Sequence, residues 1–163
     1  MNDLFAPPEH AWQPVSPALA RLRRTVLLVT GAVLAVAVTV AAVLLSLPAG
    51  LWVPLLAGVL VSLAAGWVLI GRNVGWWGYA ERDDDLYVKH GALFRRLVVV
   101  PYGRMQYVDV QAGPLEQAFR IASVHLHTAS PGTSARIPGL PASEAARLRD
   151  RLTALGESQA AGL

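Results

Sequence analysis

The chain has 163 residues, of which 54% are hydrophobic and 15% charged, and its mean hydropathy is +0.43. A soluble domain normally carries about 25% charged residues, so this chain is short of side chains that face water. The composition excludes an ordinary single cytosolic domain and a disordered chain. The absence of cysteine excludes a disulfide scaffold and thiolate metal sites.

The net charge of +3 does not indicate a nucleic-acid-binding surface. Residues 72–163 carry eleven Lys or Arg and nine Asp or Glu, which is nearly balanced. No stripe of basic residues alternates with aromatic residues, as contact with a phosphate backbone would require. We therefore expect no nucleic-acid partner and assign the excess charge to arginines that flank membrane helices.

The deficit of charge is local, since residues 25–71 contain no Asp, Glu, Lys, Arg or His. Residues 25–47 and 51–71 are continuously apolar or small, and the triplet at 48–50, Pro-Ala-Gly, is typical of a turn. Crossing about 30 Å of hydrocarbon takes roughly 20 helical residues, so we predict a transmembrane hairpin. A soluble core helix is excluded because the rest of the chain could not surround it. A cleaved signal peptide has a shorter apolar core.

The residues that flank the two stretches predict the orientation of the hairpin. Lys and Arg near the ends of membrane helices stay cytoplasmic, so we expect both termini in the cytoplasm and a multi-pass anchor in the plasma membrane. Tryptophans at headgroup depth would anchor both surfaces. The flanking residues are Arg21, Arg23, Arg24 and Arg72, with Trp52 at the outer end and Trp67, Trp76 and Trp77 at the inner end.

Gly58, Ser62 and Gly66 recur every four residues in the second stretch. Small residues at this spacing let helices approach closely, which favours packing within the hairpin or against another chain. Glycine is also simply common in membrane helices, so both interpretations stay open. No ionisable residue lies inside either stretch, and since proton relays and ion pathways usually need one, a transporter is disfavoured.

After residue 72, short segments of alternating polarity are separated by turn residues, which is typical of antiparallel β-structure. We predict six or seven strands, followed by a helix that begins at Pro141 and ends at Gly156. Residues 1–24 are expected to be a partly disordered cytoplasmic segment and residues 157–163 a disordered tail. The helix carries an apolar stripe of Ala145, Leu148, Leu152 and Leu155. The expected strands cover residues 73–82, 86–89, 93–100, 105–111, 122–128 and 134–137, with turns at 83–85, 90–92, 101–103 and 130–132 and a turn or short helix at 113–119.

The region from residue 20 to residue 156 resembles the YdbS-like family of bacterial membrane proteins, which carry a pleckstrin-homology-type (bacterial PH) domain. The features that carry this resemblance are the two-span hairpin and two segments, Leu86-Tyr-Val-Lys-His-Gly-Ala-Leu-Phe-Arg95 and Val100-Pro-Tyr-Gly-Arg-Met-Gln-Tyr-Val-Asp109. Shorter matches follow at Gly113-Pro-Leu, Val124-His-Leu-His-Thr-Ala129 and Ile137-Pro-Gly-Leu-Pro. The most specific block contains Pro101, Tyr102, Arg104 and Gln106.

The resemblance implies an α+β membrane protein: a two-helix transmembrane hairpin followed by a PH-like split β-barrel of six or seven antiparallel strands with a C-terminal capping helix, over residues 72–156. It also implies a non-enzymatic role, often beside a larger relative with repeated copies of the domain. The chain departs from the family at Gln117 and Ala118, where an arginine is typical, and at Arg120, where a glycine is favoured. The conformation of that turn does not follow from the resemblance.

The sequence has no nucleophile elbow, phosphate loop or histidine–carboxylate motif, so we expect no enzyme and no cofactor. His125 and His127 share one strand face and could ligate a metal with a third ligand. Two exposed imidazoles on a solvent face are the simpler interpretation, and no metal is expected.

The charges near the predicted first hairpin argue against a specific phosphoinositide site. Asp83, Asp84 and Asp85 would repel an anionic headgroup there. Arg95 and Arg96, together with the arginines beside the spans, favour only a general attraction to anionic membrane lipid, which would orient the domain.

Two functions remain open. The first is a membrane-anchored protein-interaction or assembly module that forms a homo-oligomer or binds a larger PH-domain membrane paralogue. It is favoured by the absence of catalytic groups and by the short linker at residues 72–75, which raises the effective concentration of the domain in the membrane plane. The second is a sensor of a lipid headgroup or small ligand, acting through the open end of the barrel. Headgroup-selective binding that survives raised salt would distinguish the second.

Overall fold

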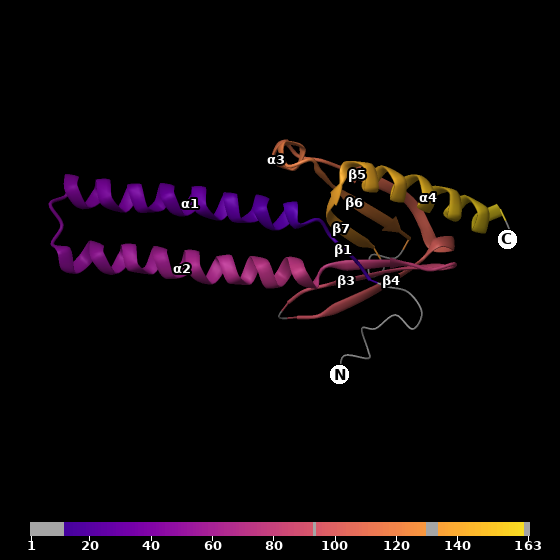
Figure 1. Ribbon diagram of the computed structural model, residues 1–163, viewed down its shortest axis with the longest axis horizontal. Coiled ribbons are helices and arrows are strands. Elements are labelled where there is room, and N and C mark those ends of the chain that lie inside the picture. Colours follow the sequence, from indigo (N-terminus) through magenta and orange to yellow (C-terminus); the bar gives the residue numbers. More distant parts are fainter. Residues whose placement is uncertain (1–11, 93, 130–133, 162–163) are drawn as a thin grey trace. The chain divides into compact units, whose positions relative to one another are not determined.

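The computed structural model describes residues 12–92, 94–129 and 134–161 (Figure 1). These residues divide into two compact units. One unit is the helical hairpin, Ala20–Arg72. The other, called the β domain below, combines residues 12–19 with residues 73–161, so the chain begins it before the hairpin and completes it afterwards.

The hairpin consists of helices α1 (Pro17–Leu44) and α2 (Ala49–Trp76). Both are long and apolar enough to cross a membrane, which agrees with the two predicted spans. Both also extend beyond the predicted stretches of 25–47 and 51–71. At its start, α1 has Pro17 in the first helical position, and the Ser16 hydroxyl accepts a hydrogen bond from the Ala18 N–H at 3.2 Å. At its end, α2 continues through Gly71 and Gly75 to Trp76, and β2 begins at Gly78.

The turn of the hairpin lies earlier than the sequence suggests, at residues 45–48 and not at residues 48–50. Ser46 adopts φ 49°, and the Leu47 N–H bonds to the Ala42 carbonyl at 2.9 Å, so a left-handed residue closes α1. Ala49 and Gly50 already belong to the first turn of α2. The turn prediction relied on the proline and glycine, whereas a serine provides the reversal.

The β domain contains two antiparallel sheets and not a closed barrel. The first has the order β1-β2-β3-β4, and the second the order β5-β6-β7. Their bounds are Gln13–Pro14 (β1), Gly78–Glu81 (β2), Asp85–His90 (β3), Arg96–Pro101 (β4), Met105–Gln111 (β5), Ile121–Thr128 (β6) and Ala135–Pro141 (β7). A single 3-10 turn, η2 (Tyr102–Arg104), joins the sheets, and the short helix α3 (Pro114–Ala118) precedes β6.

The strands predicted at 86–89, 105–111 and 122–128 agree with β3, β5 and β6 to within one residue, but the others do not. β4 begins at Arg96 and not at residue 93, and β7 continues four residues beyond the predicted end at 137. Residues 73–76 continue α2, and β2 begins only at Gly78. Asp85, expected in a turn, is the first residue of β3, and Pro141, expected at the start of the C-terminal helix, is the last residue of β7. The turn predicted at residues 130–132 lies outside the described residues.

The segment before α1 is part of the β domain. Gln13 and Pro14 pair with Tyr79 and Gly78, and the Ser16 N–H bonds to the Gly139 carbonyl at 3.0 Å. This segment therefore contacts both sheets. Val15, Ala18 and Leu19 are buried. The predicted domain, which began at residue 72, therefore lacked the segment before the hairpin.

The core lies between the two sheets and helix α4 (Ala142–Ala161), shown in yellow in Figure 1. The predicted apolar stripe is confirmed, since Ala145, Leu148 and Leu152 are fully buried and Leu155 is half-buried. The expected stop at Gly156 is wrong, because α4 continues to Ala161, so residues 157–161 of the predicted disordered tail are helical. Residues 162–163 lie outside the described residues. A Cβ on Gly156 would lie 3.7 Å from the Tyr102 carbonyl, which is ordinary van der Waals contact, and α4 continues through this glycine.

Candidate functional site

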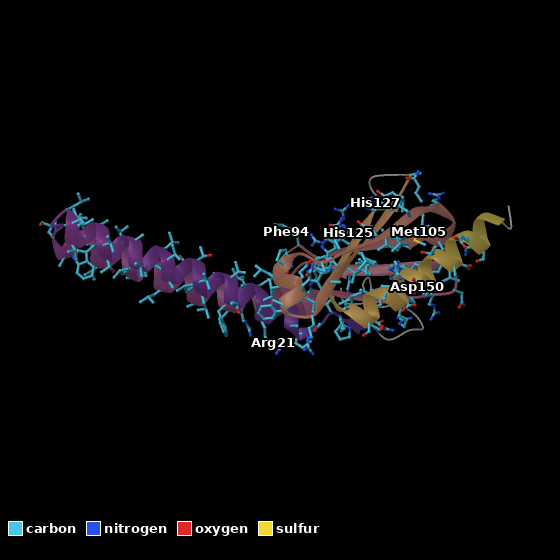
Figure 2. The ribbon with its side chains drawn as sticks, turned by 90° about the horizontal axis from the view of Figure 1, so that it is seen from above. Arg21, Phe94, Met105, His125, His127 and Asp150 are labelled. Carbon is cyan, nitrogen blue, oxygen red and sulfur yellow. The ribbon has the colours of Figure 1, made fainter. Side chains whose placement is uncertain are left out.

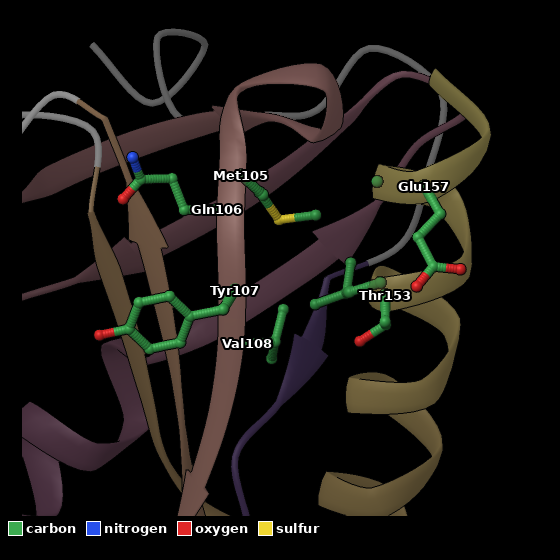
Figure 3. Close-up of a pocket in the computed structure, with 8 residues that line it drawn as sticks. Met105, Gln106, Tyr107, Val108, Thr153 and Glu157 are labelled. Carbon is green, nitrogen blue, oxygen red and sulfur yellow. The ribbon is translucent and has the colours of Figure 1, made fainter. Parts of the chain in front are cut away.

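A groove separates the edge strand β5 from the last turns of α4 (Figure 3). Its volume is about 320 Å³, and it is open to solvent on one side. We call it the β5–α4 groove. Its lining residues come from two elements and are Met105, Gln106, Tyr107 and Val108 of β5 with Leu152, Thr153, Gly156 and Glu157 of α4.

The geometry of β5 sets the shape of the groove. The pairing with β6 shifts register between Met105 and Tyr107, which places a bulge at Gln106. Figure 3 shows Met105 and Val108 directed toward α4, while Gln106 and Tyr107 both point to the other side, as expected where two successive residues oppose one. Among the described residues no strand pairs with the outer edge of β5, so its backbone is available to a further strand.

The most specific block of the family resemblance, which contains Pro101, Tyr102, Arg104 and Gln106, leads into β5 and helps to shape the groove. Pro101 ends β4, and Tyr102 is fully buried, with its hydroxyl donating to the Arg82 carbonyl at 3.0 Å. Burial raises the pKa of Tyr102 to about 12. Arg104 is exposed at the end of η2, and Gln106 lies at the bulge. The most specific part of the sequence pattern therefore builds the corner between the sheets and one wall of the groove.

A second cluster joins α4 to β2 and consists of charged groups. The Glu81 side chain is only 7% exposed, and its carboxylate contacts Arg147 at 2.6 Å and Arg151 at 3.1 Å. Arg147 also binds Glu144 at 2.6 Å, and Glu144 accepts the Tyr79 hydroxyl at 2.7 Å.

The hydrogen bond from Arg147 holds the pKa of Glu144 below its ordinary value, although burial acts in the opposite direction. Burial, followed by the hydrogen bond to Glu144, raises the pKa of Tyr79. A space of about 410 Å³ lies beside these groups, but the charges around it balance: Arg82, Arg147 and Arg151 face Glu81, Asp83 and Glu144. We interpret the cluster as a structural clamp and not as a site for a charged ligand.

His125 and His127 lie on the outer face of the second sheet (Figure 2). They are half-buried and not fully exposed as expected: His127 stacks on Tyr107 at 4.2 Å between ring centroids, and the two imidazoles stack at 6.4 Å. Burial, together with the charge of Arg136, lowers the pKa of His125. Within the described residues no three His, Asp or Glu side chains gather in a way that could hold a metal.

The acidic turn is used in the structure of the domain. The Asp84 carbonyl accepts the Tyr102 N–H at 3.1 Å, and the Asp84 carboxylate accepts the Gln159 amide at 3.2 Å. The Asp85 carbonyl accepts the Arg82 N–H at 2.9 Å. Of the three aspartates, Asp84 thus joins the turn to α4 through its side chain, while the backbone carbonyls of Asp84 and Asp85 hold η2 and the end of β2.

The predicted membrane-flanking residues fall into separate places. In the hairpin, the Arg24 guanidinium lies over the Trp67 ring at 4.5 Å, and Arg23 is half-buried. Arg21 and Arg72 are exposed, and Trp52 is half-buried near the start of α2. In the β domain, Trp76 contacts Arg95 and Trp77 stacks on His90.

Two apolar helices with a two-sheet β domain closed by a C-terminal helix define a membrane protein with a PH-like domain. Comparison with known families agrees. The sequence model of the bacterial PH domain family matches residues 18–155, which is most of the chain, so the chain belongs to this family.

A curated relative, the UPF0699 transmembrane protein YdbS of Bacillus subtilis (strain 168), is 35% identical over 79 residues. The aligned region covers 48% of this chain, and the chain spans about half the length of that relative. No solved structure significantly matches the chain. These findings confirm the YdbS-like resemblance that the sequence indicated.

Sequence reasoning missed the β5–α4 groove and the role of residues 12–19. The block from Pro101 to Gln106 carried the one available signal for the groove, because a proline, a buried tyrosine and a half-exposed strand in succession indicate a corner next to a sheet edge. For residues 12–19, Ser16 before Pro17 indicates a helix start at residue 17, eight residues before the apolar stretch.

Proposed function

We propose that this chain is a non-enzymatic, membrane-anchored assembly module. Its PH-like domain binds an extended segment of a second membrane protein along the free edge of β5. The partner is another copy of the chain or a larger membrane protein with the same kind of domain. The observation that carries this proposal is the β5–α4 groove: an open edge strand that lies next to a helix wall with mixed polar and apolar character.

The physics of strand addition fits this groove. An added strand gains main-chain hydrogen bonds from the open edge, while pockets for alternate side chains provide selectivity. Tyr107, which is 56% exposed, and Met105 offer contact surface on either side of the strand. An exposed edge strand can pair with other chains and cause aggregation, and a bound partner strand would prevent this.

The hairpin supports the proposal by confining the domain to a plane. The arginines in the first turns of α1 and after residue 71, with none in the turn of the hairpin, favour the cytoplasmic face of the plasma membrane for both termini. Because residues 12–19 and 73–161 fold together, both ends of the hairpin connect to the same domain and must lie on the same side of the membrane. Confinement raises the effective concentration of the groove toward neighbours in the same membrane.

The test places a photo-crosslinking amino acid at Thr153, which lines the groove, and compares it with the same amino acid at Ala154. The two neighbours project about 100° apart around α4, and both are exposed, so they sample different faces at equal depth. We expect an adduct in cells from position 153 that is absent or much weaker at 154. Mass spectrometry of the adduct then identifies a second copy or a larger PH-domain protein.

Equal adducts at both positions, or none at either position in cells that contain the natural membrane, would contradict the proposal. A strictly monomeric chain in mild detergent with no adduct at 153 would contradict it as well. A partner captured at 153 whose crosslink survives deletion of its extended segments would replace strand addition with another mode of binding.

A further inference from the structure

Three tryptophans and three basic side chains form a collar at one end of the β domain. Each tryptophan has its own basic partner: Arg95 lies over the Trp76 ring at 3.7 Å, Lys89 lies over the Trp12 ring at 4.3 Å, and His90 stacks on Trp77 at 4.9 Å. The Trp77 indole N–H also donates to the Asn73 side chain at 3.3 Å. Amphipathic rings, two of them beside the cations of Lys89 and Arg95, are typical of the headgroup layer of a bilayer.

The chain itself holds this collar close to the bilayer. Trp76 is the last residue of α2 and lies five positions after Gly71, where the uncharged stretch ends. Five residues of helix advance about 7.5 Å, which is comparable to the thickness of one headgroup layer. Since Arg95 contacts the Trp76 ring, the turn between β3 and β4 lies at the same end of the domain as Trp76.

That turn presents an apolar side chain to the surroundings. Phe94 is 91% exposed, more than any other large hydrophobic residue of the described chain (Figure 2). Gly91 shapes the turn with φ +94°, and a side chain there would overlap the Phe94 carbonyl oxygen. The exposure of Phe94 leaves a large apolar surface without contacts in water.

The charge of this region is one-sided. Residues 86–100, which include the turn at Phe94, contain Lys89, Arg95 and Arg96 and no Asp or Glu. The acidic residues Asp83, Asp84 and Asp85 lie at the other end of β3, about 17 Å away along a six-residue strand. The end of the β3–β4 hairpin at Phe94 thus carries basic residues alone, whereas at the other end the three aspartates lie near Arg82 and Arg104.

We propose that the turn at Phe94 docks on the anionic bilayer surface that anchors the chain. Phe94 enters the boundary between headgroups and acyl chains, Arg95 and Arg96 contact lipid phosphates, and the collar tryptophans lie at headgroup depth. Aromatic insertion beside cations is the combination that binds amphipathic segments to interfaces. The docked turn holds the acidic turn away from the membrane. This inference is independent of the β5–α4 groove, and either can fail without the other.

The absence of cysteine allows a direct test on the full chain. A single cysteine replaces Phe94, and a matched control replaces Asp150, an exposed residue of α4 whose side chain is 68% exposed. Each is labelled with an environment-sensitive fluorophore and reconstituted into phosphatidylcholine vesicles with or without phosphatidylglycerol. Quenching by spin-labelled lipid in both leaflets reports insertion regardless of the orientation of the chain. Iodide in the buffer reports exposure to water.

With phosphatidylglycerol we expect the label at 94 to shift to shorter wavelength, to be quenched strongly by the spin-labelled lipid and to lose most of its iodide quenching. The label at 150 should remain quenched by iodide alone. Adding Arg95→Gln and Arg96→Gln to the 94-labelled chain should remove the advantage of the anionic vesicles.

Three outcomes would overturn the proposal. A label at 94 that is as accessible to iodide as the label at 150 in both kinds of vesicle leaves the turn in water. Protection at 94 that rises with the protein-to-lipid ratio but brings no quenching by lipid assigns a second copy as the occupant. Lipid quenching at 94 that is unchanged by phosphatidylglycerol and by both arginine substitutions removes the role of the headgroup charge.

Discussion

The two units of this protein differ in where they place their apolar side chains: the hairpin exposes them, and the β domain buries them. In the hairpin, Val43 and Leu44 are 72% and 77% exposed, whereas in the β domain Leu148 and Leu152 are fully buried. The hairpin has no formal charge over residues 25–71, while residues 72–163 carry twenty charged residues, eleven basic and nine acidic. Leucine and valine therefore do not indicate a core by themselves, because the solvent around each unit decides which direction is favourable.

The units also differ in what holds them together. In lipid no hydrophobic effect drives helices together, so close packing of small residues does so. Gly31 and Gly66 meet Leu63 and Leu27 of the opposite helix in this way. In the β domain, burial of α4 against the sheets provides the stability, supplemented by the charged clamp on β2.

The largest expected effect comes from removing the same side chain in each unit. Leu148→Ala opens a cavity beneath α4 and should lower the free energy of unfolding of the β domain by about 3 kcal/mol. Leu60 is 67% exposed on the hairpin, and Leu60→Ala should change the free energy of unfolding by less than about 1 kcal/mol in detergent. Denaturant unfolding of the full chain in mild detergent, followed by tryptophan fluorescence, measures both. Equal losses of unfolding free energy for the two variants would contradict the assignment of the hairpin to lipid and the β domain to water.

Residues 12–19 test where the boundary between the units lies. Gly139 adopts φ +70°, and a side chain there would approach the Leu19 Cβ to 2.6 Å. Gly139→Ala should therefore cost about 2 kcal/mol and should speed hydrogen exchange of the Ser16 amide, which bonds to the Gly139 carbonyl.

The matched control for this glycine is Gly75→Ala. Gly75 lies in α2 with open space around its Cα, so alanine there should keep or slightly raise stability. An unchanged Ser16 exchange rate in Gly139→Ala would show that the segment before α1 is not held by the β domain in solution.

Much of this architecture follows from the sequence, because lipid and water each select a distinct pattern of apolar and charged residues. The uncharged run predicts the hairpin, and the spacing of Ala145, Leu148 and Leu152 predicts the buried face of α4. The bounds of β5 were predicted to the residue, since its alternating pattern begins and ends at clear breaks. The ends of α1 and α2 were not predicted, because hydropathy marks the membrane thickness and not the point where hydrogen bonding stops.

The candidate sites were less predictable, because they depend on contacts between residues far apart in sequence. The β5–α4 groove needs Thr153 and Gly156 beside Met105, and nothing in the spacing of these residues announces it. The tryptophan at position 76 was predicted at the membrane surface, but its partner Arg95 and the exposure of Phe94 required the turn to be placed. The half-burial of His125 and His127 depends on the stack with Tyr107 across the sheet.

The charged clamp gives the β domain a dependence on acid that the hairpin lacks. Arg147 holds the pKa of Glu144 below its ordinary value of 4.5, so its contribution to stability is present above that pH. It is lost as the pH falls through the lower, folded-state pKa. Glu144→Gln should reduce stability near pH 7 by about 0.5–1 kcal/mol and flatten the profile below pH 4.5.

Thermal unfolding of the full chain across pH measures this difference. The control is Asp150→Asn, which alters an exposed pair with Arg149 on the same helix and should leave the profile unchanged. Parallel profiles for the wild type and Glu144→Gln would mean that the clamp carries no acid dependence.

The smallest effect concerns a single backbone angle in the β domain. Arg120 adopts φ +55° at the turn before β6. The left-handed region costs a residue with a side chain about 1–2 kcal/mol, while glycine loses about 0.4–1 kcal/mol through the freedom it adds to the unfolded chain. Arg120→Gly should therefore raise the free energy of unfolding by about 0.5 kcal/mol.

Arg104→Gly is the matched control for this substitution, because Arg104 is equally exposed but is not among the positive-φ residues of the described chain. It gains nothing from relief of strain and should lose about 0.5–1 kcal/mol. Opposite signs for two arginine-to-glycine changes in one domain isolate the backbone conformation as the cause. If both variants lost stability, the Arg120 side chain would be contributing contacts that outweigh its strain, and the turn would tolerate arginine for that reason.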